Sequence, residues 1–184
     1  MSTTSNGTTF TACAAGDLYL VRVVGPGICK ESGRFENLLS EVERLKPGRL
    51  VIDLSECPRM DSTFAGAFLR LADRAEAGGY RVFLAGARDQ VPELLDTLCL
   101  NDVLESVPLP DLATLERVEL VDRDLPKEQV MALSLDGHER LAALNSSNAC
   151  RFESLLRVLR DQLPGAAKPG CDAIGGSAGD VGGR

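Results

Sequence analysis

The sequence contains no tryptophan, and aromatic residues of all kinds account for only 4% of the chain. Hydrophobic residues nevertheless reach 44%, so the chain can build a core, which must be largely aliphatic. No stretch approaches the roughly 20 apolar residues that a membrane span needs. The N-terminal stretch "MSTTSNGTTF" lacks a basic region followed by an apolar one, so we expect no secretory signal.

Ligands for a metal ion are also scarce. The chain has one histidine and no Cys-x-x-Cys pair, so we expect neither a zinc site nor any other cofactor. An even number of cysteines is compatible with disulfides, but without a secretory signal we expect free thiols in a reducing cytoplasm. The six cysteines are Cys13, Cys29, Cys57, Cys99, Cys150 and Cys171.

Positive charge is in deficit, because 20 Lys and Arg stand against 27 Asp and Glu, for a formal net charge of −7. A surface of this sign repels nucleic acids and anionic membranes, so we expect neither as a partner. The charge suits an acidic protein that meets a basic protein partner.

Strand and helix patterns alternate between residues 9 and 110. The predicted order is two strands around a turn at 15–17, a helix at 31–45, a strand at 49–55, a helix at 63–77, a strand at 80–86, a short helix at 89–100 and a last strand at 103–109. This order indicates an α/β fold, with a mixed β-sheet and helices packed on one face.

The chain changes character after residue 110. Residues 111–126 show weak periodicity, whereas 127–163 look strongly helical, and Gly137 is expected to divide them into two pieces. The expected division is a disordered N-terminus at 1–8, a domain at 9–110, a helical extension at 111–163 and a disordered Gly- and Ala-rich tail at 164–184. The apolar face of the extension must be buried, either on its own domain or in a homodimer, which we favour.

The stretch "RMDSTFAG", Arg59–Gly66, joins a buried strand to the next helix. Asp61, Ser62 and Thr63 are residue types that cap helix N-termini, so ordinary capping is one interpretation. A serine at a helix start can also carry a phosphate, because the free N–H groups and the helix dipole favour an anion. The two roles are compatible, with Asp61 or Ser62 as the cap and Ser62 as the phosphoacceptor.

These residues resemble a known family. The strand ending in "VIDLS", a short link, a hydrophobic residue, "DST" and the following amphipathic helix resemble the STAS domain of anti-sigma factor antagonists. A strand ending in "LAG", a short helix and a last strand extend the resemblance over roughly residues 9–108. The resemblance implies a mixed β-sheet with helices on one face, and a role in protein–protein interaction rather than catalysis.

The resemblance also implies a mechanism. In this family the unphosphorylated domain binds a partner-switch serine kinase that is also an anti-sigma factor. The kinase phosphorylates one serine using ATP, and a serine phosphatase removes the phosphate. That serine corresponds to Ser62 here, and Asp53, Asp61, Thr63 and Phe64 complete the expected partner-binding group. The chain would be a cytoplasmic, bacterial phosphoprotein that regulates transcription by partner switching.

Phe64 departs from the family pattern, because many members carry glycine there, and its ring is expected to fill part of the docking surface. An alternative is a constitutive STAS scaffold, or a self-associating interaction protein, in which Ser62 is never modified. A serine hydrolase is disfavoured, because the chain has no Gly-x-Ser-x-Gly motif. A triad would have to recruit His138 from the extension, and we expect that histidine to be solvated or to cap a helix.

Overall fold

The computed structural model describes residues 7–121 and 123–163. The strands are β1 (Thr9–Ala15), β2 (Leu18–Val24), β3 (Arg49–Glu56), β4 (Arg81–Ala85), β5 (Glu105–Val107) and β6 (Glu116–Val118). The helices are α1 (Cys29–Arg44), α2 (Ser62–Gly78), α3 (Val91–Thr97), α4 (Lys127–Leu144) and α5 (Ser146–Gln162), with short 3-10 turns η1 (Leu100–Asp102) and η2 (Leu112–Thr114).

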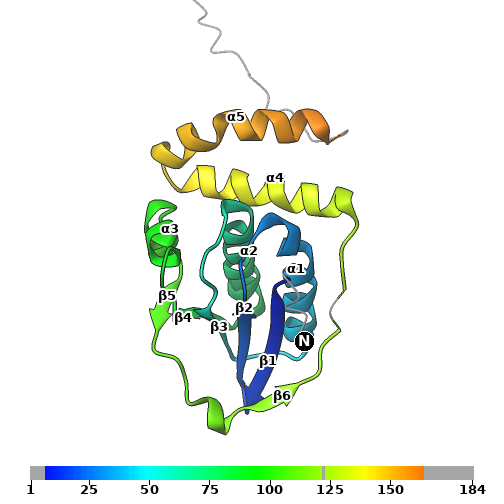
Figure 1. Cartoon of the computed structure of the whole chain (residues 1–184), viewed down its shortest axis with the longest axis vertical. Helices are drawn as coiled ribbons and strands as arrows, with labels where there is room; N and C mark the ends of the chain where they lie inside the picture. Colours follow the sequence, from blue (N-terminus) through cyan, green and yellow to red (C-terminus); the bar gives the residue numbers. More distant parts are fainter. Residues whose placement is uncertain (1–6, 122, 164–184) are drawn as a thin grey trace, which may run out of the picture.

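The strands form one six-stranded sheet in the order β5-β4-β3-β2-β1-β6. β1 and β2 are an antiparallel hairpin, β2 through β5 run parallel, and β6 is antiparallel to β1. Figure 1 shows α1 and α2 over one face of the sheet, with α4 and α5 stacked above them as a further layer. The predicted mixed sheet with helices packed on one face, followed by a helical extension, is confirmed.

The main core lies between the sheet and the first layer of helices. Because side chains alternate along a strand, Leu50, Ile52 and Leu54 of β3 point towards the helices and are fully buried. Although aromatic residues are few, they gather here: the rings of Phe35 and Phe64 stack with centroids 4.6 Å apart. The few aromatic side chains therefore fix how α1 and α2 sit on the sheet.

The segment after residue 110 contributes more than helices. Its weak periodicity hid the short strand β6, which pairs Val118 with Ala12 of β1 and closes that edge of the sheet. Leu115, just before β6, packs on the far face of the sheet with the buried side chains of Leu20 and Val51. In Figure 1 the chain runs from β5 to β6 around the lower side of the sheet and then rises to α4.

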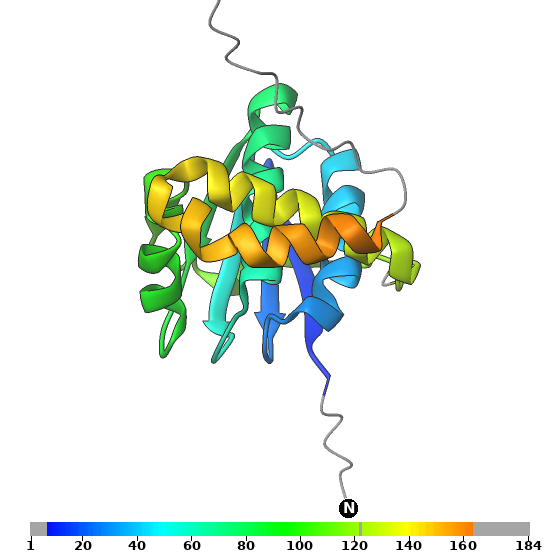
Figure 2. The same cartoon turned by 90° about the horizontal axis from the view of Figure 1, so that it is seen from above.

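The two extension helices form a hairpin, α4–α5, that lies on the chain's own domain. The prediction that Gly137 divides the helix is wrong, because Gly137 lies within α4 and the break falls at Asn145. Asn145 is the cap of α5, and its Oδ1 accepts a hydrogen bond from the backbone N–H of Asn148 at 2.8 Å. Seen from above in Figure 2, α4 crosses α1 and α2 and α5 runs alongside α4.

Two expectations about the chain ends fall largely outside the described residues, namely disorder at 1–8 and at 164–184. Thr8 does lie in the described part, where it is buried and its hydroxyl donates to the carbonyl of Pro26 at 2.7 Å. Among the helices of residues 7–121 and 123–163, none combines the length and hydropathy that crossing a bilayer requires.

Candidate functional site

The Asp-Ser-Thr segment is held in place by two loops that meet at one end of the parallel strands. The loop after β2 and the loop after β3 are joined by a parallel bridge between Gly27 and Met60. The backbone N–H of Asp61 donates to the carbonyl of Gly27 at 2.9 Å, and that of Gly27 donates to Arg59 at 3.0 Å. Asp61 therefore begins α2 from a fixed position.

Asp61 caps two helices at once. Its Oδ1 accepts from the backbone N–H of Phe64 at 2.9 Å, within α2, and its Oδ2 accepts from that of Cys29 at 2.7 Å, at the start of α1. A single carboxylate thus sits between the positive ends of two helix dipoles. Capping was left open between Asp61 and Ser62 by the sequence, and the structure assigns it to Asp61. The Ser62 hydroxyl is not needed for the cap.

Ser62 is the first residue of α2 and is half-buried. Its Oγ lies 2.9 Å from Nε2 of His138, and the other ring nitrogen, Nδ1, lies 2.7 Å from the carbonyl of Ser134. A carbonyl can only accept, so Nδ1 carries the hydrogen and Nε2 of the neutral ring is the acceptor. The Ser62 hydroxyl therefore donates to His138, which joins the start of α2 to α4.

The environment of His138 contradicts the expectation that this residue is solvated or caps a helix. It lies in the interior of α4, only 1% exposed, and its ring packs edge-on against Phe152 of α5. Burial lowers the pKa of His138, against smaller raising effects of the Ser134 carbonyl and the Asp61 carboxylate. The imidazole is thus kept neutral, in the form that accepts the Ser62 proton.

The Ser62–His138 pair has the geometry of a nucleophile and a base, but its surroundings differ from those of a hydrolase. In a serine triad a carboxylate orients the histidine, whereas here the partner of Nδ1 is the backbone carbonyl of Ser134. The base is also buried between α2 and Phe152, so a substrate has no approach to it in this conformation. The contact fits a structural joint between helices better than a reaction centre.

The neighbours of Ser62 point in opposite directions. Thr63 faces α4, is 8% exposed, and its Oγ1 lies 3.5 Å from Oγ of Ser134. Phe64 faces the sheet and is fully buried, stacked against Phe35. The ring that was expected to fill part of a docking surface is thus inside the core, and a partner cannot touch it in this conformation.

Asp53 does not join this group. By strand alternation it lies on the face of the sheet away from α2, and its carboxylate is completely buried. Its Oδ2 accepts from Nε of Arg22 at 2.6 Å, and its Oδ1 accepts from the backbone N–H of Ser55 at 2.9 Å. This ion pair between β2 and β3 gives Asp53 a structural role, apart from the Ser62 site.

The cysteines of the described part are all free thiols, namely Cys13, Cys29, Cys57, Cys99 and Cys150. Cys57, the one nearest the motif in sequence, is fully buried, and its thiol donates to the carbonyl of Arg59 at 3.3 Å. Burial raises the pKa of the Cys57 thiol, which keeps it protonated and unreactive. It is a packed side chain.

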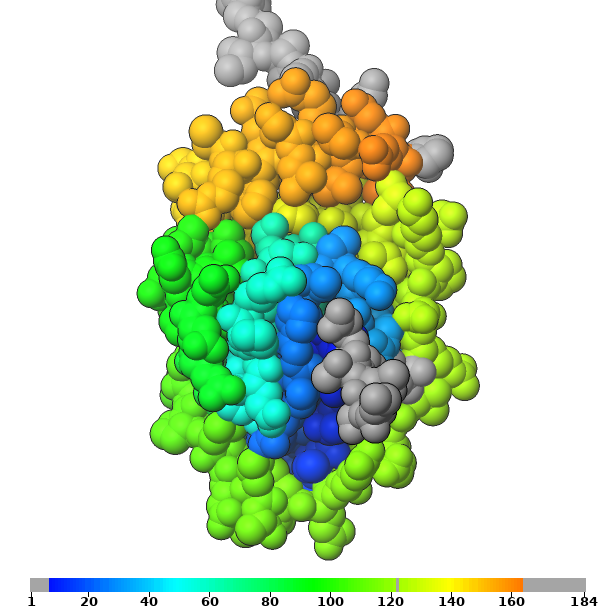
Figure 3. Space-filling model, viewed as in Figure 1, coloured from blue at the N-terminus to red at the C-terminus, as the bar shows by residue number. Residues whose placement is uncertain are grey.

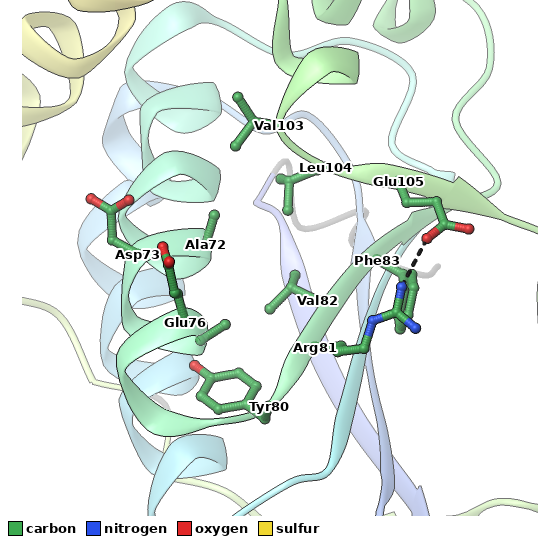
Figure 4. Close-up of a pocket in the computed structure, with 11 residues that line it drawn as sticks. Ala72, Asp73, Glu76, Tyr80, Arg81, Val82, Phe83, Val103, Leu104 and Glu105 are labelled. Carbon is green, nitrogen blue, oxygen red and sulfur yellow. Dashed lines mark hydrogen bonds and ion pairs between the residues drawn. The ribbon is translucent and has the colours of Figure 1, made fainter.

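A separate hollow of about 370 Å³ lies between α2 and the β4–β5 edge (Figure 4). Its wall combines Tyr80, Val82 and Leu104, and across its rim Arg81 pairs with Glu105 at 3.1 Å. No residue of the Asp-Ser-Thr motif lines it. No cluster of three metal-ligand side chains occurs among the described residues either. The Ser62 surface is therefore the stronger candidate.

A comparison with protein-family profiles matches residues 11–113 to the STAS domain. The chain belongs to the STAS domain family. The match begins within β1 and ends within η2, so it covers the sheet up to β5 together with α1, α2 and α3, and leaves β6 and the α4–α5 hairpin outside. A comparison with curated protein sequences found no match. STAS proteins often serve as anti-sigma factor antagonists, and they are generally not enzymes.

Sequence reasoning found Asp61, Ser62 and Thr63 as neighbours at the start of α2, and the structure places them there. It missed His138 as the partner of Ser62, because the two residues lie 76 positions apart in the sequence. It also missed Ser134, which bonds the histidine. Three small or polar residues, Ser134, Gly137 and His138, on one face of α4 are the signal that could have found the contact.

Proposed function

We propose that this STAS protein is an anti-sigma factor antagonist-like switch protein. In its unphosphorylated form it binds a partner-switch kinase that is also an anti-sigma factor, and phosphorylation of Ser62 ends that binding. A serine phosphatase restores the unmodified form. The protein acts in the cytoplasm of a bacterial cell and influences transcription through its partner, without a catalytic activity or a cofactor of its own.

The observation that carries this proposal is the division of labour between Asp61 and Ser62. Asp61 supplies the caps of α1 and α2 with its two carboxylate oxygens, so the hydroxyl of Ser62 is not needed for capping and can be modified without loss of a cap. By its resemblance to the family, Ser62 corresponds to the motif serine, and it stands in the first turn of α2, where free N–H groups favour an added anion.

A phosphate on Ser62 would change the surface strongly and the domain weakly. It would add about −1.5 to −2 charges at neutral pH, directly beside the Asp61 carboxylate. The helix terminus offsets part of this charge, worth about 0.3–1 kcal/mol at an exposed site. The sheet and its core do not touch Ser62, so a partner that docks there can be repelled while the domain stays folded.

The second candidate is a constitutive scaffold in which Ser62 is never modified. One observation favours it: the hydroxyl of Ser62 is already engaged with His138 in a contact between helices. In this case Ser62 would be a structural residue, and the exposed Leu155 and Val158 of α5 would offer a surface for self-association. The homodimer through the C-terminal helices remains a proposal under this candidate.

Mapping of the phosphate distinguishes the two candidates. The full chain is incubated with ATP and candidate partner-switch kinases, and the intact mass and the phosphopeptides are measured. The switch predicts one phosphate, at Ser62, which is absent from Ser62→Ala and present in the matched variant Thr63→Ser. A scaffold predicts no gain in mass with any kinase, together with a stable dimer in sedimentation.

The effect on binding needs a second experiment. Kinases captured by the wild-type chain are compared with those captured by Ser62→Glu, whose carboxylate imitates part of the phosphate charge. The proposal predicts that the substitution weakens capture, while the control Ser146→Glu, at an exposed position of α5, leaves capture unchanged. Equal capture by all three chains would contradict a partner surface at Ser62.

A further inference from the structure

The α4–α5 hairpin lies directly on the surface that the proposed function needs free. The contact between α4 and α2 starts at Ser62, the first residue of α2, whose Oγ lies 2.9 Å from Nε2 of His138. Next to it, Oγ1 of Thr63 lies 3.5 Å from Oγ of Ser134. In the space-filling view of Figure 3 the hairpin forms one end of the molecule, closed over the first layer of helices. α4 would therefore block a kinase from reaching the hydroxyl of Ser62.

The closeness of α4 and α2 depends on two glycines at their crossing. A Cβ added at Gly66 would lie 2.8 Å from the Cα of Gly137, and one added at Gly137 would lie 3.2 Å from the Cα of Gly66. The first distance is too short for any Cβ, so Gly66 must lack a side chain, and a side chain at Gly137 would crowd both the Gly66 backbone and Nη1 of Arg70, 2.8 Å away. Gly66 and Gly137 therefore bring the hydroxyl and the histidine within hydrogen-bond reach.

Arg70, one turn further along α2, holds the same crossing with hydrogen bonds. Its guanidinium donates to Glu36 of α1 through Nε at 2.6 Å, and through Nη1 it donates to the carbonyl of Leu133 in α4 at 2.7 Å. If α4 moved away, Arg70 would keep its ion pair with Glu36 and exchange the Leu133 carbonyl for water. The polar part of the contact can therefore open without stranding a charge.

Two further polar contacts of the hairpin are of a kind that water can replace. Arg140 of α4 pairs with Asp73 of α2 at the surface, and Asn148 of α5 donates to the carbonyl of Leu98 at 3.0 Å. The apolar part consists of the buried Leu135, Leu141, Phe152 and Leu156, which join the main core cluster, and of partly buried side chains packed against it, namely Ala142, Leu144, Leu159 and Leu163. The contact thus combines an extension of the core with polar bonds, and interfaces that are more polar than a core are typical of parts that move relative to each other.

We propose that the α4–α5 hairpin is a detachable cover of the Ser62 surface, which closes over that surface in cis and must leave it before a kinase or a partner can reach Ser62. The inference rests on the proposed function in one respect, that Ser62 is the residue modified. It goes beyond it by naming the device that regulates access and the segment of the chain that provides it.

As long as His138 is neutral, the closed cover and a phosphate on Ser62 disfavour each other. A phosphoester oxygen has no proton, so phosphorylated Ser62 cannot donate to Nε2 of His138 in any rotamer. The closed form would then hold a buried nitrogen without its donor, close to a new double charge. Because coupling between two sites is reciprocal, an open cover favours phosphorylation and phosphate favours an open cover.

The test uses two variants of the full chain with opposite effects. Gly137→Leu inserts a side chain at the crossing and is expected to open the cover, whereas Ala143→Leu adds the same side chain at an exposed position of α4 and is the matched control. The second variant, Thr63→Cys with Ser134→Cys, puts two thiols in place of two hydroxyl oxygens that lie 3.5 Å apart. A small adjustment brings the sulfurs to bonding distance, so oxidation forms a disulfide that locks α4 onto α2.

Opening is measured without any kinase, by the labelling rate of Cys99. Cys99 is partly exposed and its Sγ accepts a hydrogen bond from the Asn145 amide between α4 and α5, so an open hairpin exposes it further. We expect about tenfold faster labelling in Gly137→Leu, a factor that corresponds to about 1.4 kcal/mol, and slower labelling than wild type in the oxidised lock. Cys13, in β1 between β2 and β6, serves as the internal reference.

Phosphorylation is then compared in the oxidised and reduced forms of the lock, so that each protein is its own control. The inference predicts that the oxidised lock takes up phosphate at least about tenfold more slowly than the reduced form, a factor worth about 1.4 kcal/mol. Equal rates in the two forms would overturn the cover while leaving the switch intact. Unchanged Cys99 labelling in Gly137→Leu, with circular dichroism of a folded chain, would overturn it as well. Clear opening at Cys99 with no phosphate in any variant supports the cover and contradicts the switch.

Discussion

The two faces of α2 are built on different principles. The face towards the sheet carries Phe64, Phe68 and Leu71, all fully buried, and packs without polar contacts against an apolar layer. The face towards α4 carries Ser62, Gly66 and Arg70, which make hydrogen bonds or leave room for a backbone. One helix thus joins a permanent core on one side and a hydrogen-bonded, separable contact on the other.

This difference explains how a switch can sit on a stable domain. Loss of the inner contacts exposes apolar surface, at about 25 cal/mol for each Å². Loss of the outer contacts exchanges protein hydrogen bonds for hydrogen bonds to water, at about 0.5–1.5 kcal/mol each, and exposes the smaller apolar face of the hairpin. Substitutions on the two faces should therefore separate global unfolding from opening of the hairpin.

The largest effect is expected on the inner face. Phe64→Ala removes a ring that contacts Phe35 and Phe68 and should lower the free energy of unfolding by about 3–5 kcal/mol. Leu155→Ala, at a position of α5 that is 38% exposed, should change it by no more than about 0.5 kcal/mol. Chemical denaturation of both variants checks the contrast, and a small effect of Phe64→Ala would mean that the inner face is not the core.

Arg70 lies at the boundary between the two faces. Arg70→Met leaves the buried Glu36 carboxylate with only Arg74 nearby, 3.2 Å away, and should lower stability by about 3 kcal/mol. Replacing both partners, Arg70→Met with Glu36→Met, should recover most of this loss, because the cost comes from an unpaired charge. Denaturant midpoints measure both variants. A double variant as unstable as the single one would show that the ion pair itself supplies the stability.

The bond between Ser62 and His138 is expected to matter for the cover alone. Ser62→Ala leaves a buried nitrogen without its donor and should favour the open hairpin by about 1–3 kcal/mol, with little effect on the sheet. A double-mutant cycle with His138→Ala, followed by amide exchange in α4 and in β3, isolates the coupling. Additive effects of the two substitutions would show that the two side chains do not interact.

A pH dependence follows from the burial of His138. The closed form holds the pKa of His138 below its ordinary value of about 6.5, so protonation favours the open form. The stability of the closed form should be complete above about pH 6.5 and fall below it, by at most about 1.4 kcal/mol per pH unit. Asp136, whose pKa is raised by burial, acts in the opposite sense. Amide exchange of α4 between about pH 5 and pH 7.5, corrected for intrinsic rates and compared with His138→Gln, checks the slope, which the variant should lack.

The smallest effect is expected at the surface pair of Arg140 and Asp73. Their side chains are 37% and 61% exposed, so solvent screens the charges and the pair contributes about 0–1 kcal/mol. Arg140→Gln should barely change Cys99 labelling, and less still at high salt. A strong effect on labelling would show that the Arg140–Asp73 pair, and not only the crossing of Gly66 and Gly137, holds the hairpin closed.

The sequence predicts the inner face of α2 well and its outer face poorly. Apolar periodicity finds Phe64, Phe68 and Leu71, because burial against a sheet leaves a regular pattern. The order of elements and the capping position of the motif follow from the same kind of local rule. These rules were enough for the mixed sheet and for the place of Ser62.

The outer face could not be predicted by these rules, because its contacts join distant parts of the chain and use residues without apolar periodicity. Gly137 looked like a helix break, yet it is the point where α4 approaches Gly66. Asn145 follows the true end of α4, but nothing in the sequence pattern marked it as a helix end, and its role as the cap of α5 is clear only from the structure. Short β6 was missed for a related reason, because three residues on an edge carry too little pattern to stand out.

Amide hydrogen exchange on the unmodified full chain tests the difference between the two faces most directly. If the hairpin is a separable cover, the amides of α4 and α5 share one opening free energy, lower than that of β3 by at least about 1.4 kcal/mol, or tenfold in exchange rate. β3 and the inner turns of α2 then exchange only through global unfolding. If α4, α5 and β3 all exchange with the same free energy, the hairpin is part of a single cooperative core and the account is contradicted.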